Sequence, residues 1–229
     1  VRLSRLVCDA PEIIALDLNP VLADAAGAIA LDARIEIAPP PPAKARVAGA
    51  NPRLTIRPYP ADWGRDETLP DGSRIHLRPV RPDDEGLIGA MLTRVDPEDV
   101  RLRFFSRIGQ FTHPFLARLT QLDYSRAMSF VALDERAGEA IGFVWLYADP
   151  NHEKGEFAVM VRSDRKGRGV GWILMRRMIE WARADQLEAI EGYVLAENAA
   201  MLKMARELGF VETDAPESRS VRVLRLKLG

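Results

Sequence analysis

The sequence predicts a mixed α/β domain, a central sheet flanked by helices, over residues 72–229. Three observations support this fold class. Strand patterns and helix patterns alternate from about residue 53 onward. Three strand patterns follow one another at residues 127–133, 140–148 and 155–163. A glycine-rich loop then leads into an amphipathic helix. The 229 residues suffice for one full domain with a tail, or for two small domains.

The region before this domain divides into two parts. Residues 1–38 contain two apolar runs separated by turn residues 24–27, which predict a short helix and two paired strands with too small a core to be stable alone. Four prolines at residues 39–42 cannot donate ladder hydrogen bonds, so we expect a linker and lead-in over residues 39–71. Because the chain begins with Val1 rather than Met, we expect a fragment or a truncated reading frame.

The elements of the main domain follow in order. Residues 74–81 alternate as a strand, and Pro82 with three acidic residues then fits a first helical turn. Helices are also predicted at residues 97–107, 113–122 and 198–210, and further strands at 188–194 and 221–228. The helix after the glycine loop has an apolar face made of Val170, Ile173, Leu174, Met178 and Trp181, and a polar face made of Arg176, Arg177 and Glu180.

Composition excludes several functions. With 32 Lys and Arg against 33 Asp and Glu, the net charge of −1 does not fit a nucleic-acid binder, and Trp172 alone adjoins the basic loop. The lone Cys8 can form neither an internal disulfide nor a multi-thiolate metal site, which favours the reducing cytoplasm. Asp17, Asp24 and Asp32 interrupt the early apolar runs, so we expect no membrane span.

The glycine loop, "KGRGVG" at residues 166–171, predicts a phosphate site. A strand, a glycine turn and a helix N-terminus together present backbone N–H groups and a positive partial charge. The loop lacks the Gly-Lys-Ser/Thr ending of a P-loop and lies mid-sheet, which argues against a mononucleotide or dinucleotide fold. In isolation it would also fit an ordinary basic turn. The histidines show no metal-ligand spacing, and we expect no metal.

The loop resembles that of the GNAT superfamily of acyl-CoA-dependent N-acyltransferases, whose signature is Arg/Gln, two residues, Gly, one residue, Gly/Ala. A second family element is a helix that begins with asparagine, here Asn198, beside the pantetheine arm. The resemblance implies a GNAT fold that binds the pyrophosphate of acetyl-CoA on the loop amides. The implied binding residues are Lys166, Gly167, Arg168, Gly169, Val170, Gly171 and Asn198.

Residues 55–210 resemble more narrowly the acetyltransferase domain of Pat-type bacterial protein lysine acetyltransferases, through segments such as "DGSRIHLRPVRPDDE" and "RLRFFSRI". In that group the domain often follows an acyl-CoA-synthetase-like region that ends in an ATP-grasp fold, and residues 1–38 resemble its last strands. This places Asn19 and Asp32 at magnesium-ligand positions. Because the rest of such a domain is missing, we interpret both as relics without function here.

The chemistry that the resemblance implies needs a base, because a lysine amine with a pKa of about 10.4 is protonated at neutral pH. Glu156 matches the position of the glutamate base in the Pat-type group; the alternative is a solvent-facing strand residue or an ion-pair partner. Val159 and Val161 are the candidates for main-chain contacts with pantetheine and thioester. The tyrosine that many GNAT enzymes use as an acid is replaced by Ala205, with Met204 beside it, and Tyr193 and Tyr124 are possible substitutes.

The predicted function is direct acetyl transfer from acetyl-CoA to a lysine amine of a protein in the cytoplasm, and the resemblance implies acyl-CoA synthetases as substrates. Two alternatives stay open. The acceptor could be a small-molecule amine, which a narrow acidic pocket would favour. The domain could also sense acyl-CoA without turnover, an alternative that the absent tyrosine motivates and Glu156 opposes.

Overall fold

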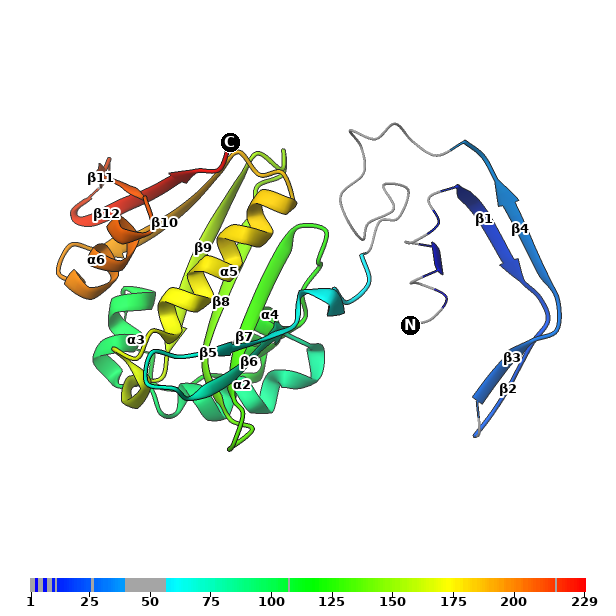
Figure 1. Cartoon of the computed structure of the whole chain (residues 1–229), viewed down its shortest axis with the longest axis horizontal. Coiled ribbons are helices and arrows are strands. Elements are labelled where there is room, and N and C mark those ends of the chain that lie inside the picture. Colours follow the sequence, from blue (N-terminus) through cyan, green and yellow to red (C-terminus); the bar gives the residue numbers. More distant parts are fainter. Residues whose placement is uncertain are drawn as a thin grey trace. The chain divides into compact units, whose positions relative to one another are not determined.

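The computed structural model describes residues 3, 6, 7, 10, 12–25, 27–39, 57–106, 108–216 and 218–229. These form two compact units, Val1–Pro58 and Tyr59–Gly229, each of which is described by itself (Figure 1). Cys8 and residues 40–56, most of the predicted linker, lie outside the described residues. In the part of the chain that is described, no helix is long and apolar enough to cross a lipid bilayer.

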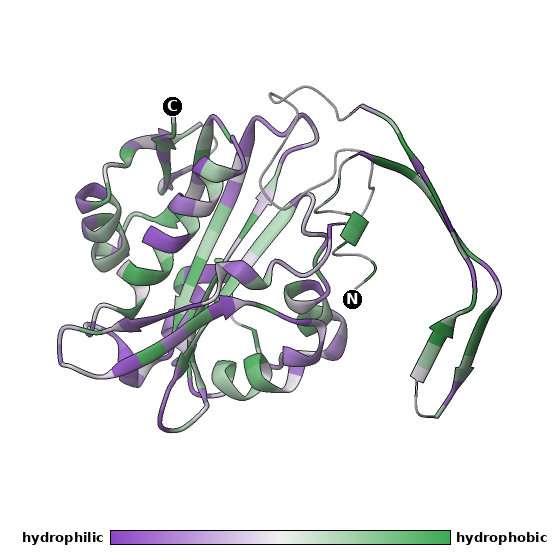
Figure 2. Cartoon of the chain, turned by 45° about the vertical axis from the view of Figure 1, so that its right-hand side comes forward, coloured by the Kyte–Doolittle hydropathy of each residue, from purple (hydrophilic) through white to green (hydrophobic). Residues whose placement is uncertain are grey.

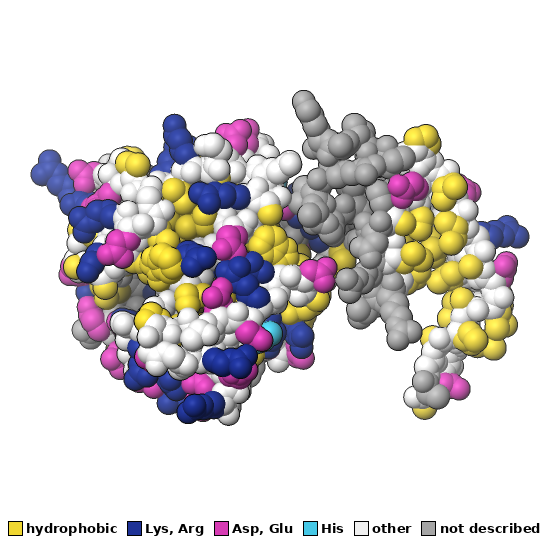
Figure 3. Space-filling model, viewed as in Figure 1, with side chains coloured by type: hydrophobic (Ala, Val, Ile, Leu, Met, Phe, Trp, Pro, Cys, Tyr) yellow, Lys and Arg dark blue, Asp and Glu magenta, His cyan; other side chains and the backbone are white. Residues whose placement is uncertain are grey.

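The first unit contains two antiparallel strand pairs. Strand β1 (Ile13–Leu18) pairs with β4 (Ala33–Ile37), and β2 (Val21–Asp24) pairs with β3 (Gly27–Ala30). The two apolar runs therefore form four strands, and the short helix predicted with them does not occur among the described residues 12–25 and 27–39. In the first run Pro20, which has no N–H to continue a ladder, separates β1 from β2. Most apolar side chains of these strands are exposed, and Figure 3 shows them on the surface of this unit. The described strands of this unit therefore bury little apolar surface among themselves.

The second unit is built on an eight-stranded sheet in the order β11-β12-β10-β9-β8-β7-β6-β5. Its strands are β5 (Arg65–Thr68), β6 (Arg74–Pro79), β7 (Ala127–Asp134), β8 (Ala140–Ala148), β9 (Lys154–Val161), β10 (Ala189–Leu195), β11 (Val211–Ala215) and β12 (Ser218–Lys227). All neighbouring pairs are antiparallel except β9 with β10, which run parallel. The sheet is therefore mixed, as the sequence predicts.

Helices cover both faces of this sheet (Figure 1). They are α2 (Glu85–Leu92), α3 (Pro97–Phe104), α4 (His113–Thr120), α5 (Val170–Ala184) and α6 (Ala199–Glu207), with short 3₁₀ turns η2 (Ala61–Trp63), η3 (Pro82–Asp84) and η4 (Ser163–Arg165). One core lies between the sheet and helices α5 and α6, and a second lies between the sheet and α2, α3 and α4. The central strands β7 to β9 are apolar on both faces because both are covered (Figure 2).

Helix α5 packs its predicted apolar face on the sheet: Val170, Ile173, Leu174, Met178 and Trp181 are all buried, which confirms the prediction. The prediction that Arg177 lies on the solvent face is wrong. Its guanidinium lies 4.6 Å from the centroid of the Trp63 ring and donates a 2.7 Å hydrogen bond to the Trp63 carbonyl. Arg177 is 8% exposed because η2, which the sequence pattern did not reveal, crosses this part of α5.

The sequence patterns also did not predict two edge strands. Strand β5 pairs with β6 although it lies in the segment predicted as lead-in, and β11 pairs with β12. The compact unit accordingly begins at Tyr59, before the residue 72 at which we expected the domain to start. Both strands are short and largely polar, so neither shows the apolar alternation of a half-buried strand.

Candidate active site

The parallel pair β9 and β10 separates after a short ladder. Its register runs only through Lys154, Gly155 and Glu156, which face Ala189, Ile190 and Glu191. Beyond Glu156 the two strands diverge, and the gap between them opens into a cavity of about 510 Å³. The wall is mostly apolar and comes from β9, β10, the glycine loop, α5, α6 and one side of α3. Such a cleft can hold an extended molecule against backbone groups that the sheet leaves unpaired.

The glycine loop forms one end of this cavity. Gly167 and Gly169 have φ values of +71° and +89°, a conformation that glycine adopts without strain, and Gly169 is the N-cap of α5. The first amides of α5 have no partners within the helix, so they are available to an anion. A Cβ on Gly171 would lie 3.4 Å from Val161 and 3.6 Å from the sulfur of Met204, inside the cavity wall.

The two cations of the loop are already engaged. Lys166 lines the cavity, but its ammonium is bound by the carboxylate of Asp99 on α3. The other oxygen of Asp99 accepts a 2.5 Å hydrogen bond from the hydroxyl of Ser163. Arg168 does not line the cavity, and its guanidinium pairs with Asp71 at 3.6 Å. The loop thus offers backbone amides directly, whereas a second anion at Lys166 would share the ammonium with Asp99.

The walls of the cavity include the other predicted contacts. Val159 and Val161 line it from β9, and Asn198 lines it from the start of α6. The side chain of Asn198 is used as the helix cap, where its oxygen accepts a 3.1 Å hydrogen bond from the Met201 amide. Met204 also faces the cavity, while Ala205 is fully buried beside it.

Glu156 occupies the last paired position of β9, where the strands begin to diverge. Its side chain is exposed, lies on the same sheet face as Ala158 and Met160, and is not part of the cavity wall itself. Across the sheet its partners are Tyr147 on β8 and Glu191 on β10. Glu191 is paired with Arg225 at 3.2 Å and Lys154 at 3.7 Å, whereas Glu156, at the point where the strands diverge, forms no ion pair with a described residue.

The two tyrosines considered as acids differ in position. Tyr193 lines the cavity and is 44% exposed. Tyr124 is buried away from it, its hydroxyl donates to the Val80 carbonyl, and burial raises its pKa. Of the two, Tyr193 is therefore the one that a departing group in the cavity could reach.

Sequence reasoning missed the contribution of α3, whose residues Asp99, Leu102 and Arg103 form the side of the cavity facing β9 and β10. Asp99 joins α3 to the glycine loop, and Arg101 joins it to Glu197 in the turn before α6. No local signal marks these residues, because the pairs join positions 67 and 96 residues apart in the chain.

Comparison with known families agrees with this geometry. Residues 74–211 match the family model of the GNAT acetyltransferase domain. The chain belongs to the GNAT acetyltransferase family. Residues 1–37 match the model of an ATP-grasp domain, which confirms the predicted relationship of the N-terminal region. Members of the GNAT family transfer acetyl groups from acetyl-CoA.

Individual relatives agree as well. The GNAT chain is 30% identical to an acetyltransferase of Pseudomonas aeruginosa over 164 residues, 71% of this chain and 88% of the relative. It is 29% identical to the acetyltransferase Pat of Mycolicibacterium smegmatis over 141 residues, 61% of this chain but only 42% of that protein. The solved GNAT domain of S. lividans PAT superposes with a TM-score of 0.70 at 25% identity, covering 75% of this chain and 100% of that domain.

The described residues contain no group of three or more His, Cys, Asp or Glu side chains that could hold a metal ion. Charges of both signs are interspersed on the face shown in Figure 3. The site therefore offers the backbone amides at the start of α5, the cations Arg103 and Lys166 in the cavity wall, and the exposed carboxylate of Glu156 beside it.

Proposed function

We propose that this GNAT domain transfers the acetyl group of acetyl-CoA to the side-chain amine of a lysine in a protein, with Glu156 as the general base. The observation that carries the proposal is the position of Glu156, at the last residue pair before β9 and β10 diverge. A carboxylate there stands beside the inner end of the cavity without blocking it. The similarity to Pat and to the S. lividans PAT domain supports a protein acceptor.

In this proposal, residues at different positions along the cavity have different roles. The amides of residues 167–171 would bind the pyrophosphate, and the main chain at Val159 and Val161 would hold the pantetheine arm. Glu156, directly or through a water, would take a proton from the lysine ammonium, and the free amine would then attack the thioester carbon. A backbone N–H of the divergent part of β9 would stabilise the oxyanion. The carbon–sulfur bond then breaks, the attacking nitrogen loses its extra proton to give the amide, and that proton passes to the leaving thiolate, whose thiol has a pKa of about 8.5.

Release of free CoA from acetyl-CoA tests this proposal, measured with and without an acyl-CoA synthetase as the acceptor. Glu156→Gln should lower acceptor-dependent release about 100-fold or more while acetyl-CoA affinity stays unchanged, since general-base catalysis contributes about that factor. Glu188→Gln is the matched control, because Glu188 is an exposed glutamate just before β10, outside the cavity wall. It should keep full activity.

Two other outcomes would each support a different function for the domain. Release that depends on a small amine but not on any protein would make the acceptor a small molecule. Binding of acetyl-CoA without release, with either kind of acceptor, would make the domain an acyl-CoA sensor. Full activity of the Glu156→Gln variant would remove this residue from the chemistry.

A further inference from the structure

One arginine at the cavity has no polar partner. Among the described residues, four side chains contain a buried nitrogen or oxygen atom without a hydrogen bond: Arg65, Arg103, Arg177 and Asp185. The other three make ion pairs or hydrogen bonds through other atoms, as with Arg65 and Glu180, Arg177 and Trp63, and Asp185 and His152. Arg103 makes neither with any described residue. Its Nε is therefore a buried donor without an acceptor, and its terminal nitrogens bond to no described residue.

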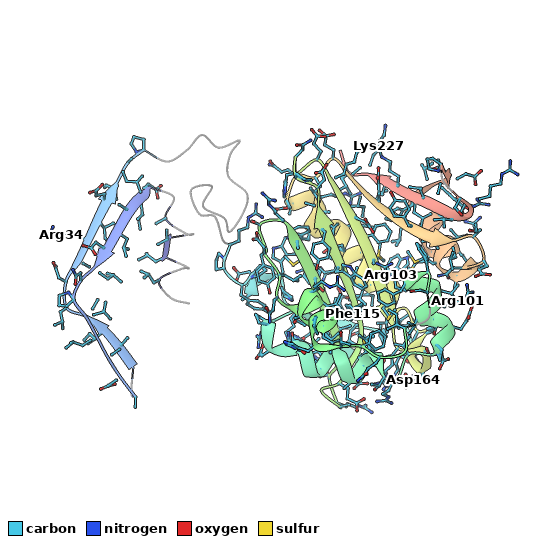
Figure 4. All side chains as sticks on the ribbon, turned by 180° about the vertical axis from the view of Figure 1, so that it is seen from behind. Arg34, Arg101, Arg103, Phe115, Asp164 and Lys227 are labelled. Carbon is cyan, nitrogen blue, oxygen red and sulfur yellow. The ribbon has the colours of Figure 1, made fainter. Side chains whose placement is uncertain are left out.

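The position of Arg103 is fixed by aromatic rings rather than by hydrogen bonds. Its guanidinium lies 4.7 Å from the centroid of the Trp145 ring and 5.3 Å from that of Phe104. Trp145 is 7% exposed and stacks on Phe143, so the surface beneath the guanidinium is rigid. Figure 4 views the molecule from this side and labels Arg103 beside the sheet. The two rings hold the guanidinium in place within the wall of the cavity that Arg103 lines.

This arrangement is costly without a ligand. Burial lowers the pKa of Arg103 to about 10, against the opposing effect of the negative charge of Glu156, so the group stays charged at neutral pH. Stacking on the aromatic rings stabilises the guanidinium, but the buried Nε–H has no acceptor, and an unsatisfied buried donor costs free energy. The expected partner is therefore an anion that arrives with a ligand.

The ligand that Arg103 binds lies away from the glycine loop, at the end of the cavity where the acetyl acceptor would bind. Arg103 lies four residues after Asp99, which is bound to Lys166 of the glycine loop. Four residues of α-helix span about 6 Å, so Arg103 is displaced from the phosphate end by about one turn. It interacts electrostatically with Glu156 yet forms no ion pair with it. Glu156 and Arg103 thus offer one anion and one cation to an acceptor that carries an ammonium and a carboxylate.

We propose that Arg103 binds a carboxylate next to the reactive amine of the acceptor, so that the enzyme prefers a lysine flanked by an acidic residue. This inference rests on the proposed function. In an extended peptide the side chain two residues away lies on the same side as the lysine, so a glutamate at that position can reach as deep as the ammonium. A free amino acid could offer the same pair of charges through its own carboxylate.

Binding of bisubstrate conjugates tests the proposal without turnover. In each conjugate CoA is joined through an acetyl bridge to the lysine Nζ of a short peptide, with Glu or Gln two residues before or after the lysine. Calorimetry with the full chain should show about tenfold tighter binding of a Glu conjugate than of its Gln counterpart. Arg103→Met should abolish this difference and leave acetyl-CoA affinity unchanged. The control Arg183→Met, at the exposed end of α5, should retain the difference.

Several results would overturn the proposal. Equal binding of Glu and Gln conjugates by the unchanged chain would do so, as would a preference that survives Arg103→Met. If Arg103→Met weakened the binding of acetyl-CoA as much as the binding of the Glu conjugate, Arg103 would belong to the donor site instead. A carboxylate preference seen only between a free amino acid and its amide would assign the acceptor to small molecules. Glu156→Gln should keep the conjugate preference, so loss of turnover there tests the proposed base separately.

Discussion

Replacing Gly171 by alanine should make the protein more stable and a poorer binder of acetyl-CoA. Gly171 is the second residue of α5, and its added Cβ would meet Val161 at 3.4 Å and Met204 at 3.6 Å, both ordinary contact distances. The folded chain therefore accepts the methyl group without strain. A glycine inside a helix costs about 0.5–1 kcal/mol relative to alanine, so the free energy of unfolding should rise by about that amount.

Binding should change in the opposite direction, because the same methyl group lies in the cavity wall where the amides of α5 must approach the phosphates. Loss of one hydrogen bond to a charged group costs about 1.5–3 kcal/mol. Since 1.4 kcal/mol is a factor of about ten in affinity, the dissociation constant for CoA should rise roughly 10- to 100-fold.

Thermal unfolding and calorimetric titration with CoA measure the two effects. A gain of 1 kcal/mol raises the melting temperature of a domain of this size by about 2–4 °C. The matched control is Gly86→Ala, at the second residue of α2, where an added Cβ would meet nothing within 4 Å. This control should gain similar stability and bind CoA normally. Normal CoA binding by Gly171→Ala would refute the argument that backbone approaches the ligand here, and lower stability would refute the packing argument.

Two further predictions concern charge. Asp99→Asn should tighten CoA binding about fivefold, because Lys166 loses a competing carboxylate worth about 1 kcal/mol; titration at two salt concentrations measures this, and weaker binding would show that Asp99 supports the site. Burial alone would raise the pKa of Asp84, but hydrogen bonds from Arg78 and the Arg81 amide outweigh it and lower the pKa. Because the pKa of Asp84 is lower in the folded state, its carboxylate stabilises the folded protein at pH values above the unfolded pKa of about 3.9. This stabilisation is lost as the pH falls through the folded pKa. Asp84→Asn should thus lose about 1.5–3 kcal/mol at pH 7, because the half-buried Arg78 loses its charged hydrogen-bond partner, and should remove this part of the acid sensitivity. Urea unfolding from pH 2.5 to 7 measures both, and an unchanged pH profile would contradict the assignment.

Local patterns in the sequence account for much of the site. The glycine turn before α5, the helix that begins at Asn198 and the apolar face of α5 each depend on residues a few positions apart, and the structure contains all three. That these residues bind acetyl-CoA, and that Glu156 is the base, stay predictions.

Other features depend on which distant elements meet. From the sequence, Arg103 resembles a surface residue on a short polar helix. In the structure, the fold brings Trp145, which is 42 positions later in the chain, into contact with its guanidinium. Arg177 was assigned to solvent because nothing near it in sequence signals Trp63. In both cases an aromatic ring from another element changes the surroundings of the cation, and helical periodicity contains no information about that ring.

Because the ladder between β9 and β10 is short, the stability of the folded chain should depend on the concentration of the ligand that binds between these strands. Three residue pairs join these strands, and past Glu156 the facing backbone groups depend on water or on a ligand for hydrogen bonds. A molecule that fills the gap acts as a missing strand, so amide hydrogen exchange along residues 157–161 should slow when acetyl-CoA is added. A ligand at 100 times its dissociation constant adds about 2.7 kcal/mol to the free energy of unfolding. The lifetime of the folded chain would therefore rise and fall with the acetyl-CoA concentration around it.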